Sequence, residues 1–311
     1  MIIPKINFII KIPPYLQPGD TIAITCPAGY MPADKAATCI STLQHWGYQV
    51  IVGKTLGSDS QNYFSADDAS RAAELQNMLD DKSINAILFG RGGYGMGRII
   101  DKLKFKKFIK NPKWLIGFSD ITVLHTHLLS NYKIASMHAP MAAAFNDGEY
   151  MNEYVHSLKD ALVGVKANYK VPIHSFNKLG TANGRLVGGN LALLAHVIGT
   201  ASDFETKNQI LFIEDIGEYI YNIDRLMYQI KRSGKLKKLA GLILGGFTDV
   251  KDTERPFGKN IDEVLKEIIS DLKCPVCFHF PVSHGKENYA LKIGMQYKLI
   301  VAANKVILKE I

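Results

Sequence analysis

Cysteine is scarce in this chain, with four residues among 311, and its spacing fits neither a disulfide framework nor a complete metal site. Cys274 and Cys277 match C-x-x-C, but the sequence holds no second such pair to complete a zinc site. The apolar run 275–280 predicts a buried strand, in which the two thiols would point to opposite faces. We therefore predict core cysteines in a reducing compartment, with no metal and no cofactor.

Long hydrophobic runs are also missing, since no window approaches the roughly 18 uninterrupted apolar residues of a membrane helix. Residues 1–10 are mostly apolar, but Lys5 and Asn7 interrupt them, and no small-residue cleavage site of the signal-peptide type follows. These features predict a cytoplasmic protein with no membrane partner.

Acidic residues are outnumbered by basic ones, 29 to 37, which gives a formal net charge of +8 and predicts attraction to anions. The lysines gather in segments 102–113 and 231–238. In the first segment they are interleaved with apolar residues, which indicates one buried and one solvated face. Because no nucleic-acid-binding motif accompanies them, we predict no nucleic-acid partner.

The composition itself, 47% hydrophobic and 21% charged, is typical of a soluble globular enzyme of about two domains. In the first half, β-rich runs alternate with helical patterns, which predicts an α/β domain with a parallel sheet covered by helices. Ligands of such sheets bind at the carboxyl ends of the strands, where 27–29, 90–97 and Ser119 would converge. The predicted strands are 21–26, 48–52, 86–89 and 114–116, and the predicted helices are 33–46 and 66–79.

A second unit follows a segment of weak patterning that begins at Tyr150 and contains a helix-like stretch at 154–163. We predict a first domain at 1–160, a linker at 161–180 and a second domain at 181–311. The second domain is predicted to contain strands 185–187, 210–213 and 239–244, helices 190–198, 220–233 and 261–272, and three short strands near the end.

Ser119 stands where the apolar strand 114–116 gives way to a helical pattern. A sharp strand-to-helix turn exposes a hydroxyl as a nucleophile beside free N–H groups of the helix, but the local sequence alone favours an ordinary helix N-cap.

The glycine-rich segment 91–98 lacks the Lys-Ser/Thr pair of a phosphate-binding loop. It predicts a tight turn, and the segment alone leaves two roles open, contact with a ligand and a purely structural turn.

Two further segments place acid and base groups at the ends of elements. Glu214 and Asp215 follow the apolar strand 210–213, and His284 lies in a turn between strands. Each has an ordinary structural explanation when taken alone. Together with Ser119 they supply what nucleophilic acyl transfer needs, because a serine requires a histidine to take its proton and a carboxylate to orient that histidine.

Several motifs in one order, spread over nearly the whole chain, resemble the LD-carboxypeptidase family of serine peptidases, also called muramoyltetrapeptide carboxypeptidases. The matching motifs are Leu16-Gln17-Pro18-Gly19-Asp20, Pro27-Ala28-Gly29, Tyr63-Phe64 with Asp68 and Arg71, Arg91-Gly92-Gly93-Tyr94-Gly95, Gly117-Phe118-Ser119-Asp120, Gly188-Gly189-Asn190-Leu191, Leu211-Phe212-Ile213-Glu214-Asp215 and His284-Gly285.

The resemblance implies a role for each matching residue. Ser119 would be the nucleophile, His284 the general base and Glu214 the orienting acid, with Asp215 as the rival acid. The backbone N–H groups of Asp120 and of a glycine of the Gly92-Gly93 pair would form the oxyanion hole. Charge and position suggest Arg91 and Arg98 as substrate-binding residues, and Tyr94 of the same segment is predicted with them.

The resemblance also implies a fold and a reaction. It implies a flavodoxin-like N-terminal domain, a smaller β-rich α/β C-terminal domain, an active site between them and a homodimer. The reaction would be hydrolysis of the amide between the L-centre of a diamino acid and the terminal D-alanine of murein tetrapeptides, in peptidoglycan recycling. Two alternatives stay open: a microcin-C self-immunity-type peptidase that cleaves an aminoacyl-nucleotide amide, and a non-catalytic muropeptide-binding protein.

Overall fold

The computed structural model describes residues 9–146 and 152–311. The first eight residues, on which the signal-peptide prediction depends, lie outside the described residues, as does Tyr150. Among the described residues, no helix combines the length and the apolar character needed to cross a membrane.

The first sheet lies in the N-terminal half and is built mainly from short apolar strands. It contains β1 (Thr21–Thr25), β2 (Gln49–Val52), β3 (Ala86–Phe89), β4 (Trp114–Ile116), β5 (Ser136–His138) and β11 (Leu291–Ile293). The order is β11-β5-β4-β3-β1-β2, with β1 to β5 parallel and β11 antiparallel. Counted from β2, the parallel strands have the order 2-1-3-4-5 of flavodoxin-like sheets, so the predicted fold class is confirmed.

Helices cover both faces of this sheet because its strands are apolar on both sides. Trp114 and Leu115, neighbours in β4, pack into cores on opposite faces. One core contains α1 (Ala37–His45) and α6 (Glu153–Leu162), and the other contains α2 (Asp68–Asp80), α3 (Met96–Ile99), α4 (Lys106–Lys110) and α5 (Thr122–Tyr132). Short 3-10 turns lie at Ala33–Ala36, Ile100–Lys102, Ser119–Ile121 and Ala142–Asn146.

The second sheet is mixed. It contains β6 (Asn168–Val171), β7 (Gly180–Asn190), β8 (Ile210–Ile216), β9 (Gly241–Thr248), β10 (Val276–Cys277), β12 (Gln296–Val301) and β13 (Val306–Glu310), in the order β10-β9-β8-β7-β12-β13-β6. Strands β7 to β10 are parallel, whereas β12, β13 and β6 pair antiparallel. The helices α7 (Leu191–Val197), α8 (Ile220–Arg232) and α9 (Ile261–Ile268) pack against the parallel part.

Three features differ from the sequence-based expectations. Strand β7 is longer than the predicted 185–187, because its polar first half, 180–185, pairs with β12 rather than burying two apolar faces. Strand β6 lies within 161–180, where a linker was expected, and forms an edge of the second sheet. Strand β11 comes from the C-terminal part of the chain but completes the first sheet beside β5.

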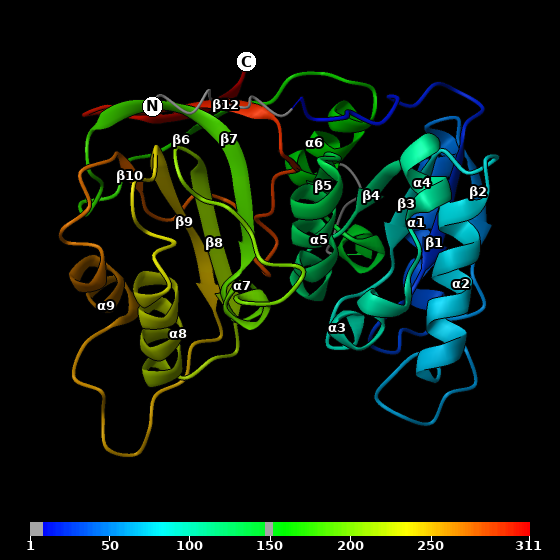
Figure 1. Ribbon diagram of the computed structural model, residues 1–311, viewed down its shortest axis with the longest axis horizontal. Coiled ribbons are helices and arrows are strands. Elements are labelled where there is room, and N and C mark those ends of the chain that lie inside the picture. Colours follow the sequence, from blue (N-terminus) through cyan, green and yellow to red (C-terminus); the bar gives the residue numbers. More distant parts are fainter. Residues whose placement is uncertain (1–8, 147–151) are drawn as a thin grey trace, which may run out of the picture.

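The two sheets lie side by side with α5 between them (Figure 1), and α5 contacts both α7 and β7. A hydrogen bond of 3.1 Å from the Asn190 N–H to Thr122 Oγ1 joins the end of β7 to the start of α5. The end of β7 and the start of α5 therefore meet at the junction between the two halves.

Candidate active site

Ser119 follows β4 closely and begins the 3-10 turn that leads into α5. Its backbone φ is 62°, in the left-handed region that a residue other than glycine adopts at a cost of roughly 1–3 kcal/mol. The N-cap position of this turn is Phe118 and that of α5 is Ile121, so the geometry does not support a helix N-cap role for the serine. A strained serine between a strand and a helix has the arrangement of a nucleophile elbow.

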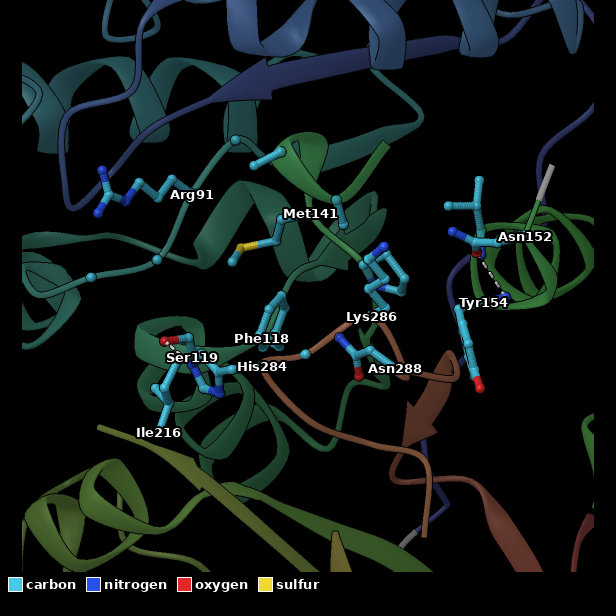
Figure 2. Close-up of a pocket in the computed structure, with 18 residues that line it drawn as sticks. Arg91, Phe118, Ser119, Met141, Asn152, Tyr154, Ile216, His284, Lys286 and Asn288 are labelled. Carbon is cyan, nitrogen blue, oxygen red and sulfur yellow. Dashed lines mark hydrogen bonds between the residues drawn. The ribbon is translucent and has the colours of Figure 1, made fainter. Parts of the chain in front are cut away.

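His284 joins Ser119 to Glu214 in one chain of hydrogen bonds. Its Nε2 lies 2.9 Å from Ser119 Oγ, although the two residues are 165 positions apart in the sequence. Its Nδ1 lies 2.6 Å from Glu214 Oε2, on β8. Figure 2 shows Ser119 and His284 turned toward each other at one end of a pocket. The structure thus brings together the three residues that the sequence nominated for acyl transfer.

The environment of His284 sets its proton affinity. Burial alone would lower its pKa, but the charge and the hydrogen bond of the fully buried Glu214 carboxylate raise it. The net result is a pKa of His284 above the ordinary value. Asp215 adds a smaller effect in the same direction. A histidine held in this way is suited to accept the serine proton, because the neighbouring carboxylate stabilises the imidazolium that forms.

Asp215, the alternative candidate for the orienting acid, forms hydrogen bonds with other groups than His284. One of its carboxylate oxygens accepts a 2.7 Å hydrogen bond from Asn190 Nδ2, and the other accepts from the Ala192 N–H at the start of α7. Burial raises the pKa of Asp215 to about 6. The pairing between β8 and β9 is irregular between Ile213 and Asp215, and a bulge of this kind re-aims neighbouring side chains. The geometry therefore favours Glu214 as the partner of His284.

A glycine pair in β9 lets the segment that carries His284 lie against the sheet. A Cβ on Gly245 would come within 2.2 Å of the Val282 carbonyl oxygen, and one on Gly246 within 2.6 Å of Ser283 Cβ. The Gly246 N–H also donates to the Val282 carbonyl, at 3.0 Å. Neither glycine was among the site residues predicted from the sequence. Their signal is a Gly-Gly pair that directly follows an apolar strand, where side chains would otherwise be expected.

The glycine-rich segment after β3 lies against Ser119. A Cβ on Gly92 would lie 3.0 Å from Ser119 Oγ, so only glycine fits here without displacement. The Gly92 carbonyl accepts a hydrogen bond from the Gly29 N–H. Because a trans peptide places its C=O and N–H on opposite sides, the Gly93 N–H points away from Gly29. Both glycines line the pocket that holds Ser119, as expected for oxyanion-hole donors.

Asp120 connects the nucleophile turn to the glycine-rich segment. Its buried carboxylate accepts a 2.7 Å hydrogen bond from the Met96 N–H, and burial raises its pKa to about 6. Its own N–H follows Ser119 directly and donates to no group among the described residues. The side chain therefore fixes the distance between the two candidate oxyanion donors, while the backbone N–H stays available.

The pocket beside Ser119 has a volume of about 430 Å³. It is lined from the first half by 90–93, 118–119, 140–141 and 143–144, from the start of α6 by Asn152, Tyr154 and Val155, and from the second half by Ile216, 284–286 and Asn288. Arg91 and Lys286 are its cations, and none of the described lining residues is an aspartate or a glutamate. A pocket of this charge favours an anionic ligand.

The three residues suggested for substrate binding lie in different places. Arg91 lines the pocket, and its guanidinium donates to the Tyr30 carbonyl. Tyr94 and Arg98 are not among the described residues that line it. Arg98 instead forms an ion pair of 2.9 Å with Asp68.

Comparison with known proteins shows the same family along both halves of the chain. A model described as the LD-carboxypeptidase N-terminal domain matches residues 22–139, and one described as the LD-carboxypeptidase C-terminal domain matches residues 183–299. The chain belongs to the LD-carboxypeptidase family. The resemblance found in the sequence motifs is confirmed.

Named relatives agree with this assignment. A Bacillus subtilis (strain 168) protein named "Probable murein peptide carboxypeptidase" is 32% identical over 96% of this chain and 94% of the relative. The crystal structure of muramoyltetrapeptide carboxypeptidase from Oxalobacter formigenes has a TM-score of 0.83 and 30% identity, covering 93% of this chain and 98% of that chain. The Escherichia coli microcin C7 self-immunity protein MccF is 26% identical over 90% of each chain.

Potential metal ligands in this LD-carboxypeptidase family member gather away from the pocket. Within the described part of the chain, the one such group is His174, Asp262 and His279, whose ligand atoms lie within 4.8 Å of one another. The two imidazoles are stacked, with ring centres 4.6 Å apart and an interplanar angle of 17°. Rings in this parallel arrangement cannot both aim a lone pair at one ion without turning, so the geometry gives little support for a metal here.

Proposed function

We propose that this protein is a serine LD-carboxypeptidase that hydrolyses the amide between the L-centre of a diamino acid and the terminal D-alanine of murein tetrapeptides. The observation that carries the proposal is the continuous contact from Ser119 through His284 to Glu214, with distances of 2.9 and 2.6 Å. The names of the murein-peptide relatives support the substrate class. The cationic pocket supports a substrate with free carboxylates.

The proposed chemistry follows the order of these contacts. Ser119 Oγ attacks the carbonyl carbon while His284 Nε2 takes its proton, and Glu214 holds the Nδ1–H of the resulting imidazolium. The N–H groups of Asp120 and Gly93 stabilise the oxyanion. His284 then gives the proton to the nitrogen of the leaving D-alanine. Water, activated by the same imidazole, hydrolyses the acyl-serine and restores the free hydroxyl.

The Ser119→Ala variant tests the proposal directly. It lacks the attacking oxygen, so D-alanine release from a defined murein tetrapeptide is expected to fall at least about 10³-fold, measured by mass spectrometry. Circular dichroism and the melting temperature serve as controls for an intact fold. Turnover retained in a folded variant would reject the mechanism.

The microcin-type peptidase is the second candidate, favoured by the 26% identity to MccF over 90% of each chain. An aminoacyl-nucleotide amide and a murein tetrapeptide are both cleaved by acyl transfer, so the Ser119 geometry serves either. Side-by-side measurement of kcat/KM on the two substrates separates them. A higher value for the aminoacyl nucleotide would replace the murein proposal with this one.

A non-catalytic muropeptide-binding protein is the remaining alternative, and calorimetric binding of tetrapeptide without any product would favour it.

The proposal also includes a homodimer in the cytoplasm without a nucleic-acid partner. Light scattering of the purified protein tests the dimer, and fractionation of the producing cells tests the location.

A further inference from the structure

Asn288 is a buried amide that the proposed triad does not use. The residue is 3% exposed and lines the pocket that holds Ser119 and His284. Neither its Nδ2 nor its Oδ1 has a hydrogen-bond partner of normal geometry. Because a buried amide without a partner is destabilising, one that lines a ligand pocket points to a ligand group that completes its hydrogen bonds.

The backbone around Asn288 is held in place on both sides. Ser283 Oγ donates to the Glu287 carbonyl at 2.9 Å, just before it. The Tyr289 N–H donates to the Pro281 carbonyl, and the Ala290 N–H donates to Ser157 Oγ, each at 2.9 Å. The amide is therefore presented to the pocket on a fixed segment rather than on a free loop.

His138 indicates how the amide is oriented. It is fully buried, and burial keeps its pKa well below the ordinary value, so the imidazole is neutral and has one N–H to donate. Its ring nitrogens, like the amide atoms of Asn288, have no hydrogen-bond partner of normal geometry, and Asn288 lies close enough to raise the pKa of His138 against the larger effect of burial. A neutral imidazole N–H prefers the amide oxygen, which leaves Asn288 Nδ2 as the donor that faces the pocket.

The position of Asn288 relative to the triad identifies the part of the substrate that it meets. His284 delivers the proton to the leaving nitrogen, so the leaving group lies against the imidazole rather than against the glycine-rich segment. From His284 the chain runs directly through Lys286 to Asn288, and all three line the pocket. Figure 2 shows Asn288 and Lys286 on the side of His284 away from Ser119.

The other cation of the pocket is turned elsewhere. Arg91 donates to the Tyr30 carbonyl, and its guanidinium points away from Asn288 and Lys286 (Figure 2). Lys286 makes no ion pair with any described residue, so its charge is available. A carboxylate on the leaving amino acid would therefore meet the neutral N–H donor of Asn288 and the ammonium group of Lys286 on the same side of the pocket.

We propose that Asn288 and Lys286 form the subsite for the carboxylate of the leaving amino acid, and so restrict cleavage to the free C-terminal residue. The inference rests on the proposed function, because it takes the orientation of the leaving group from the Ser119–His284 mechanism. Asn288 Nδ2 donates to one carboxylate oxygen, and Lys286 supplies the charge.

The test measures binding without turnover. In the Ser119→Ala protein, N-acetyl-L-lysyl-D-alanine is compared by calorimetry with the same dipeptide bearing a C-terminal amide. The acid is expected to bind about 10- to 100-fold more tightly, as for a charge-assisted hydrogen bond with an ion pair. Adding Asn288→Leu should weaken the acid about 10-fold or more and leave the amide within about threefold. Lys286→Met should do the same and make binding of the acid less sensitive to salt.

Asn177→Leu is the matched control. Asn177 also has a buried, unpaired Nδ2, and its Oδ1 accepts from the Phe278 N–H, but it does not line the pocket. This variant should lose stability and keep the difference between acid and amide. Equal binding of acid and amide, no measurable binding of the acid, or a parallel loss of both ligands in Asn288→Leu would overturn the subsite. D-alanine release by the unmodified protein is scored separately, so failure of the proposed function is distinguishable from failure of the subsite.

Discussion

Gly92 and Ser119 are in such close contact that a Cβ on Gly92 would lie 2.8 Å from the Cβ of Ser119. The glycine-rich segment and the nucleophile turn are thus packed with no space for one more carbon atom. The Asp120 carboxylate, next to Ser119, also ties the two segments together by accepting a hydrogen bond from the Met96 N–H. The spacing of the candidate oxyanion donors therefore depends on the absence of a side chain at one position.

The Gly92→Ala variant should lose activity while it keeps its fold. The added methyl must push the glycine-rich segment away from Ser119, and loss of one oxyanion donor lowers kcat by about 10²- to 10³-fold. KM for a murein tetrapeptide should change less than kcat. Gly97→Ala, in the same segment, is the control, because its Cβ would meet only the end of the His196 side chain at 3.2 Å. Equal kcat in the two variants would contradict the proposed role of Gly92.

The Glu214→Gln variant tests the orienting carboxylate through the pH profile of kcat/KM. Only neutral His284 accepts the serine proton, so kcat/KM rises as pH increases through the pKa of His284. Glu214 raises that pKa, and its neutralisation should move the acidic limb to lower pH. The plateau should fall by about 10²- to 10⁴-fold, because the amide no longer stabilises the imidazolium.

Asp215→Asn is the companion variant for this experiment. Asp215 raises the pKa of His284 less than Glu214 does, and its carboxylate is bonded to Asn190 and to the start of α7. The acidic limb of the kcat/KM profile of Asp215→Asn should therefore shift less than that of Glu214→Gln. The plateau of kcat/KM in Asp215→Asn should stay above that of Glu214→Gln. An unshifted limb in Glu214→Gln, or a larger loss in Asp215→Asn, would contradict the assignment of the acid.

Much of the first sheet could be predicted from the sequence because its strands are buried on both faces. Runs such as 86–89 and 114–116 are continuously apolar, and both strands form as predicted. The first half of β7 was missed because the polar residues 180–185 are held by pairing with β12. Only Ala182 and Gly184 are buried in this half, and neither is a large apolar residue that would mark a strand in the sequence.

The candidate site divides in the same way. Ser119, Glu214 and His284 could be nominated because acyl transfer needs these residue types and the motifs resemble one family. Their contact depends on how the segment 280–284 docks on β9, which the pair Gly245–Gly246 controls. Asn288 could not be predicted from the sequence, because only its burial and its lack of hydrogen-bond partners in the structure distinguish it from other asparagines.

The strained backbone of Ser119 leads to a prediction about stability. Its φ of 62° disfavours any residue with a Cβ by about 1–2 kcal/mol, whereas glycine adopts this region freely. Ser119→Gly should therefore be more stable than Ser119→Ala by roughly 1 kcal/mol, the reverse of an ordinary alanine-to-glycine change. Urea denaturation of the two inactive variants measures the difference. A Ser119→Gly protein less stable than Ser119→Ala would show that the serine is not strained.

Asp120 makes the stability of the fold depend on pH in an unusual direction. Burial raises the pKa of its carboxyl from 3.8 to about 6, so between these values the folded chain binds more protons than the unfolded chain. Linkage then requires that the contribution of Asp120 to the free energy of unfolding falls as pH rises from 3.8 to about 6 and stays constant above.

The Asp120→Asn variant removes this titration and keeps an amide oxygen that can accept from the Met96 N–H. Relative to the unmodified protein, it should gain stability as pH rises from about 4 to about 7, by at most about 3 kcal/mol at 1.36 kcal/mol per pKa unit. Urea denaturation at several pH values across this interval measures the gain. Asp34→Asn, at an exposed position, is the control and should follow the unmodified protein at each pH. If Asp120→Asn runs parallel to the unmodified protein, the carboxyl is ionised in the folded state at low pH, and its hydrogen bonds outweigh its burial.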